Sequence, residues 1–122
     1  MATVLVVDDP GASRDLVKIV LTHAGHTVIE AADGSDGLKG ASTMNPDLVL
    51  LDLSLPSMSG PEFARALRAD PKTAATKVAL YTATPMSAAL RDFMEIYAIR
   101  HVVGKPSEPQ ELLAAIERAL AG

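Results

Sequence analysis

The 122-residue sequence predicts an α/β domain in which helices cover both faces of a mostly parallel sheet. Strand-like and helix-like segments alternate along the whole chain, which is typical of repeated βα units. Apolar residues make up 48% of the chain and aromatic residues only 3%, so the core has to consist of aliphatic side chains, as in a buried parallel sheet. Short connections and the lack of an internal repeat predict one domain over residues 1–122, without an output domain.

The first two βα units are marked by β-branched runs and turn residues. Residues 3–7 (TVLVV) predict a strand, and the break at Pro10 is followed by a helix over residues 13–24. The apolar face of that helix is expected at Leu16, Ile19, Val20 and His23. Residues 27–31 predict the second strand and residues 35–43 the second helix, which its interior glycines weaken.

The remaining three units follow the same order. Residues 47–51 (DLVLL) predict the most apolar strand, and a helix is expected over residues 61–68. Residues 77–81 predict the fourth strand, before a fourth helix, and residues 101–103 a short fifth strand before a last helix over residues 109–121. Two helix faces are expected from side chains at helical spacing: Leu90, Phe93, Met94 and Tyr97, and then Leu112, Ile116 and Leu120.

Polar residues follow four of the five predicted strands: Asp8 and Asp9, then Asp52, Thr82 and Lys105. Open α/β sheets bind ligands at the carboxyl ends of their strands, so we expect these side chains to meet at one edge. Two carboxylates about 4 Å apart repel each other by roughly 4 kcal/mol at an effective dielectric constant near 20, so a cation has to compensate. A few hard oxygen ligands suit Mg²⁺, or Mn²⁺, better than a fully caged Ca²⁺.

These residue types predict phosphoryl transfer to aspartate. That reaction needs a carboxylate nucleophile, a divalent ion, a lysine and a hydroxyl donor, because positioning and charge stabilisation do most of the work. Asp52 is the expected phosphoacceptor, and Lys105 and Thr82 are expected to contact the phosphoryl oxygens. The expected metal ligands are Asp8, Asp9, Asp52 and the main-chain carbonyl of Ser54.

Four segments, in order and at ordinary spacing, resemble the response-regulator receiver domains. They are VLVVDD (residues 4–9), PDLVLLDLSLPSMSG (46–60), YTA (81–83) and GKPSEPQELLAAI (104–116). The resemblance implies a flavodoxin-like (βα)5 three-layer sandwich with a five-stranded parallel sheet of order 2-1-3-4-5. It also implies a cis peptide between Lys105 and Pro106.

The resemblance further implies a phosphoacceptor of a two-component phosphorelay. Such a domain takes a phosphoryl group from a histidine kinase or phosphotransfer protein and then changes its interaction with an output partner or fused domain. It is a signalling phosphoacceptor rather than an enzyme, since it catalyses only its own phosphorylation and dephosphorylation, and we expect a monomer or weak homodimer. The segments YTATP (81–85) and IRHVVGKPSEPQELL (99–113) are similar to those of receivers fused to sensor histidine kinases.

Two other functions fit the same fold. Val102 stands three residues before the lysine, where many receivers carry Tyr or Phe, so the resemblance does not extend to an aromatic switch at this position. The alternative is therefore a phosphorylation-independent protein-interaction module on a receiver fold. A phosphatase with an aspartyl-phosphate intermediate fits less well, because Ser54 occupies the position where such enzymes typically place a second acid.

The composition argues against several other classes. The formal charge is −4 and Lys and Arg are not clustered, so direct nucleic-acid binding is not expected. Cysteine is absent, which excludes disulfides and thiolate metal sites. The apolar runs are too short to cross a bilayer, so we expect a cytoplasmic protein without membrane insertion. Nucleotide-binding motifs of the GxxxxGK[ST] or GxGxxG type are also missing.

Overall fold

The computed structural model describes residues 2–55, 57–105 and 107–122, and within these ranges five strands form one parallel sheet of order β2-β1-β3-β4-β5. This confirms the flavodoxin-like strand order. The strands are β1 (Thr3–Val7), β2 (Thr27–Ala31), β3 (Leu48–Asp52), β4 (Lys77–Thr82) and β5 (His101–Gly104). The helices are α1 (Ala12–His23), α2 (Gly34–Met44), α3 (Gly60–Ala69), α4 (Ala88–Ile96) and α5 (Pro109–Ala121). The cis peptide expected at Pro106 lies outside the described residues.

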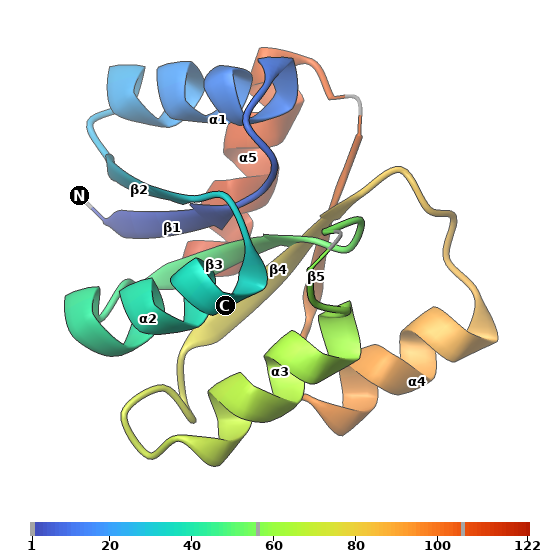
Figure 1. Cartoon of the computed structure of the whole chain (residues 1–122). Helices are drawn as coiled ribbons and strands as arrows, with labels where there is room; N and C mark the ends of the chain where they lie inside the picture. Colours follow the sequence, from blue (N-terminus) through green and yellow to red (C-terminus); the bar gives the residue numbers. More distant parts are fainter. Residues whose placement is uncertain (1, 56, 106) are drawn as a thin grey trace.

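The helices lie on both faces of the sheet, α1 and α5 on one and α2, α3 and α4 on the other (Figure 1). The three-layer sandwich is therefore confirmed. Two aliphatic cores fill the spaces between the layers. The α2–α4 core comprises Leu5, Val7, Ala31, Ala41, Val49, Leu51, Leu55, Phe63, Ala64, Leu67, Val78, Leu80, Leu90 and Ile99. The α1/α5 core comprises Val4, Val6, Val17, Leu21, Leu48, Leu50, Ala79, Tyr81, Val103, Leu112, Ile116 and Ala119.

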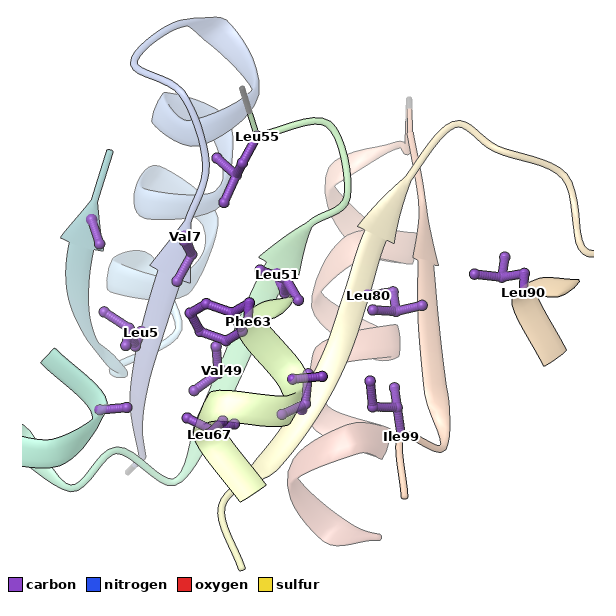
Figure 2. Packing of buried hydrophobic residues seen from close by; sticks show 14 residues of the cluster. Leu5, Val7, Val49, Leu51, Leu55, Phe63, Leu67, Leu80, Leu90 and Ile99 are labelled. Carbon is purple, nitrogen blue, oxygen red and sulfur yellow. The ribbon is translucent and has the colours of Figure 1, made fainter. Parts of the chain in front are cut away.

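The central strands read as continuous apolar runs because both of their faces are covered. Successive side chains of β1 and β3 point to opposite faces of the sheet, so Leu5 and Val7 enter one core while Val4 and Val6 enter the other. Phe63 of α3 lies over the middle of the sheet, next to the labelled side chains of β1 and β3 (Figure 2). The rigid centre of the sheet fixes where β1 and β3 end, and so where the polar edge begins.

Part of the face predicted for the first helix is wrong. The buried residues of α1 are Val17 and Leu21, whereas Ile19 is 67% exposed. Leu16 and Val20, which were correctly placed toward the interior, are half-buried against the α1/α5 core. Two neighbouring apolar stripes run along this helix, and helical periodicity alone does not decide which of them faces the sheet.

The interior glycine Gly37, which weakens the second helix on propensity grounds, has a packing role. A Cβ atom at this position would lie 2.9 Å from Val7 Cγ2 and 3.0 Å from Phe63 Cε2. Helix α2 can therefore approach the sheet closely only because this residue has no side chain. None of the helices in the described part of the chain is long and apolar enough to span a membrane.

Candidate functional site

Four of the predicted site residues meet at the carboxyl edge of the sheet. Asp52 ends β3 and Thr82 ends β4, while Asp8 directly follows β1 and Lys105 directly follows β5. Strand β1 is hydrogen-bonded to β3, β3 to β4 and β4 to β5, so the four residues come from adjacent strands. Asp8, Asp52 and Thr82 are buried, with 3%, 5% and 4% of their surface exposed. Three polar side chains are thus buried at the end of an otherwise aliphatic sheet.

The ammonium group of Lys105 bridges the two buried carboxylates. Its Nζ lies 3.3 Å from Oδ2 and 3.4 Å from Oδ1 of Asp8, and 3.4 Å from Oδ2 of Asp52. The main-chain N–H of Lys105 donates to the carbonyl of Thr82 at 3.0 Å, which ties the end of β5 to the end of β4. The pairing of β5 with β4 therefore fixes the backbone position of Lys105.

Asp52 is held as an ionised carboxylate. Its Oδ1 accepts the main-chain N–H of Ser54 at 3.0 Å, while Oδ2 faces Lys105. Burial alone would raise the pKa of Asp52, but hydrogen bonds from Asp8 and Ser54 and the charge of Lys105 outweigh it and hold that pKa below its usual value. An ionised carboxylate with one oxygen fixed by the backbone is suited to act as a nucleophile.

The pKa of Asp8 is shifted in the opposite direction. Burial, and then its hydrogen bond with Asp52, raise the pKa of Asp8 to about 6, and the charge of Lys105 only partly offsets this. The two carboxylates together carry more negative charge than one ammonium group neutralises. The net negative charge of the site therefore favours the binding of a further cation.

The remaining candidates lie at the rim of this cluster. Asp9 is exposed, and its main-chain N–H donates to Oδ1 of Asp8 at 2.8 Å. Ser54 is exposed as well. The hydroxyl oxygen of Thr82 accepts the N–H of Thr84 at 3.0 Å, which fixes it to its own loop. Among the residues that the structure describes, no three His, Asp or Glu side chains converge into a ready-made metal cluster.

The donor set nevertheless fits a hard divalent ion. Asp8 and Asp52 present carboxylate oxygens to the same ammonium group, Asp9 follows Asp8 directly in the chain, and none of these residues is a sulfur or imidazole ligand. Burial, and then the neighbouring Asp52, raise the pKa of Asp8, and a divalent ion such as Mg²⁺ or Mn²⁺ bound here would favour its ionised form. The residues present thus fit the ion expected from the sequence.

Two contacts at the site were not predicted. The ring of Tyr81 lies under Lys105, with Nζ 4.5 Å from the ring centroid. The guanidinium of Arg14 lies 3.4 Å from the carbonyl of Asp8 through Nη1 and 3.5 Å from Oε2 of Glu30 through Nη2, so it braces the ends of β1 and β2. Few aromatic residues occur in the chain, and one directly before the edge hydroxyl is a signal that could have been used for Tyr81.

This arrangement matches a known family over nearly the whole chain. A family model described as the response regulator receiver domain matches residues 4–117. The chain belongs to this family. Receiver domains are the signalling modules of two-component systems, so the resemblance noted from the sequence is confirmed at the level of the family.

Curated relatives of this receiver domain differ in length. Protein PilH of Pseudomonas aeruginosa is 32% identical over 122 residues, with 100% of both chains covered. The DNA-binding dual master transcriptional regulator RpaA of Synechocystis sp. is 34% identical over 122 residues, which cover 98% of this chain and 49% of RpaA. The chain thus spans about half the length of the DNA-binding regulators that it matches.

Solved structures share the fold closely. The chemotaxis response regulator CheY4 of Vibrio cholerae is 31% identical and superposes with a TM-score of 0.88, with 98% of each chain covered. The receiver domain of the sensor histidine kinase PA1611 of Pseudomonas aeruginosa is 22% identical, with a TM-score of 0.85 over 99% of this chain and 98% of that one. That structure has a magnesium ion coordinated in its active-site cleft, and at this identity the likeness shows the fold alone.

Proposed function

We propose that this receiver domain is the phosphoacceptor of a two-component phosphorelay and that Asp52 receives the phosphoryl group from a histidine kinase or phosphotransfer protein. One observation carries the proposal. Asp52 is a buried carboxylate at the carboxyl end of a central strand. Its Oδ1 accepts a hydrogen bond from the N–H of Ser54, and its Oδ2 forms an ion pair with Lys105. The pKa of Asp52 is held low, so the carboxylate is available as a nucleophile at neutral pH.

In the proposed reaction, a carboxylate oxygen of Asp52 forms a bond to phosphorus, and the bond from phosphorus to the donor breaks. The leaving group keeps the electron pair of that bond. Lys105 already contacts the nucleophile, and its ammonium group moves with the developing charge onto the phosphoryl oxygens. Thr82, fixed at the end of β4, directs its hydroxyl proton to the same oxygens.

The proposed metal ligands are Asp8, Asp9, Asp52 and the main-chain carbonyl of Ser54. Support comes from the excess of carboxylate charge over the one ammonium group that Asp8 and Asp52 contact; the PA1611 receiver, which shares the fold, has a magnesium ion in its active-site cleft. When bound, Mg²⁺ or Mn²⁺ supplies positive charge that stabilises the oxygens of the transferring phosphoryl group. Asp8 contributes by holding negative charge beside Asp52 without being the nucleophile.

The test is intact mass after incubation with acetyl phosphate or phosphoramidate, with and without Mg²⁺. We expect a Mg²⁺-dependent gain of about 80 Da, the mass of one phosphoryl group, which Asp52→Asn abolishes. Asp92→Asn, which removes an exposed carboxylate from α4, is the matched control and should gain the same mass as the native protein. A gain that survives in Asp52→Asn, or no gain in the native protein, contradicts the proposal.

A second function is favoured by one residue. Val102 is half-buried against the α2–α4 core, where many receivers carry an aromatic residue, so phosphorylation here does not reorient a ring. A phosphorylation-independent interaction module is the corresponding alternative. Partner binding measured with and without a beryllofluoride mimic of the phosphoryl group distinguishes the two, because the alternative requires equal affinities.

The setting of the domain is also a proposal. We expect a cytoplasmic protein, monomeric or weakly dimeric, that does not bind nucleic acid itself and acts on an output partner or fused domain. A place within a sensor histidine kinase remains a prediction from the sequence.

A further inference from the structure

The ammonium group of Lys105 lies over an aromatic ring as well as between two carboxylates. Its Nζ is 4.5 Å from the ring centroid of Tyr81, 3.3 Å from Asp8 and 3.4 Å from Asp52. We propose that Tyr81 is a positioning residue, whose ring holds the ammonium group of Lys105 at the phosphoacceptor through a cation–π contact. The inference rests on the function proposed above for Asp52, and it assigns a specific task to a residue outside the expected site.

An additional contact matters more for a lysine ammonium group than for a cation on a rigid side chain. Its ammonium group is a point charge on a flexible four-carbon stem, so two carboxylates fix its distance but leave several stem conformations open. The face of an aromatic ring attracts the cation from a third side, and the attraction strengthens where water is partly excluded. The side chain of Lys105 is only 19% exposed, so the contact lies in such a place.

The ring is itself held rigidly. Tyr81 is 2% exposed and belongs to the α1/α5 core, and in the sheet it is the register partner of Asp52. A ring fixed by core packing and by the register of the sheet provides a stable surface for a mobile ammonium group.

The contributions of the ring and of the hydroxyl group of Tyr81 can be separated by substitution. Tyr81→Phe keeps the ring and removes only the hydroxyl group, whereas Tyr81→Leu removes the ring. We expect Tyr81→Leu to lower the rate of phosphorylation by acetyl phosphate by about 3- to 30-fold, the range of a cation–π contact. Tyr81→Phe should restore the rate to within about twofold of the native value. Tyr97→Leu, which removes the other tyrosine ring at the C-terminal end of α4, is the matched control.

Two readouts distinguish positioning from general stability. Mg²⁺ affinity, measured by titration, should stay within about twofold in Tyr81→Leu, because the lost cation–π contact is with Lys105, which is not a proposed metal ligand. In a Lys105→Met background, Tyr81→Leu should cause no additional loss of rate. An equal additional loss in that background would overturn the inference, and so would a Tyr81→Phe rate as low as that of Tyr81→Leu.

The contact can also be tested without a variant. In the native protein, the ring current of Tyr81 should shift the NMR signals of the Lys105 ε-methylene protons upfield, and unshifted signals would contradict the contact even if Tyr81→Leu failed to fold. Failure of the native protein to be phosphorylated overturns the proposed function instead. A native protein that is phosphorylated, with a Tyr81→Leu rate equal to its own, overturns the inference alone.

Discussion

Asp8 and Asp52 lie at the ends of adjacent strands and share a single cation, the ammonium group of Lys105. Two buried carboxylates with one counter-charge cannot both ionise without cost, and the pair responds by separating its proton affinities. The pKa of Asp8 is raised to about 6 while that of Asp52 is lowered. Asp52 is thereby kept ionised and able to act as a nucleophile, and the ionised form of Asp8 can be stabilised by a further cation.

Asp8→Asn should stabilise the protein in the absence of metal. The substitution keeps the shape of the side chain and removes the repulsion, so we expect the free energy of unfolding to rise by about 1 kcal/mol in urea denaturation without Mg²⁺. The stabilisation that Mg²⁺ gives the native protein should be weaker in the variant, since one proposed metal ligand has lost its charge. Asp92→Asn is the control, and an Asp8→Asn variant less stable than the native protein would contradict the electrostatic account.

The same pair predicts a pH dependence. The pKa of Asp8 is 3.8 as a free side chain and about 6 in the folded protein, so the folded state binds this proton more tightly than the unfolded chain. The stabilising contribution of the protonated group is therefore complete below about pH 4 and is lost as the pH rises through 6. In urea denaturation without metal, the free energy of unfolding of the native protein should decrease relative to that of Asp8→Asn as the pH rises through this range. A stability difference that is constant with pH would exclude this origin.

Lys105→Met should lower phosphorylation far more than it changes folding. The ammonium group is the protein's own cation next to Asp52, and losing one preorganised charge of this kind costs about 10²–10³-fold in rate. Rates with acetyl phosphate, followed by intact mass, provide the measurement. Lys18→Met removes an exposed lysine paired with Glu30 and should leave the rate unchanged. A Lys105→Met rate within a few-fold of native would remove this lysine from the mechanism.

Two glycines of the same helix should respond in opposite directions to alanine. Alanine has the higher helix propensity by about 1 kcal/mol, and Gly40→Ala meets only ordinary contacts, 3.4 Å and 3.5 Å from the Leu5 methyl groups, so it should stabilise the protein. Gly37→Ala places its methyl group 2.9 Å from Val7 Cγ2, and overpacking there should cost about 1–3 kcal/mol. Guanidinium denaturation of both variants compares them directly. Stabilisation by Gly37→Ala would show that helix and sheet are not in close contact there.

The features that could be predicted from the sequence are those marked by residues close together in the chain. Turn residues such as Pro10 separate the elements, and β-branched runs mark the strands, so the predicted bounds lie within one or two residues of the observed β3 (Leu48–Asp52) and α3 (Gly60–Ala69). The polar residues could be grouped because parallel strands bring their carboxyl ends to one edge. Ile19 shows the limit: it was predicted on the apolar face of the first helix and is exposed instead, because exposure depends on how α1 is rotated against α5 and the sheet.

By itself, then, the sequence determined the order of the elements, the two-sided burial of the sheet and the presence of Asp8, Asp52, Thr82 and Lys105 at its polar edge. Each of these follows from composition and from spacing over a few residues. Only the tertiary structure decided that Lys105 bridges the two acids, that the pKa of Asp8 is raised while that of Asp52 is lowered, and that Tyr81 lies beneath the lysine. Charge state and side-chain contact depend on burial and on distances between residues far apart in the chain, and local sequence does not encode these quantities.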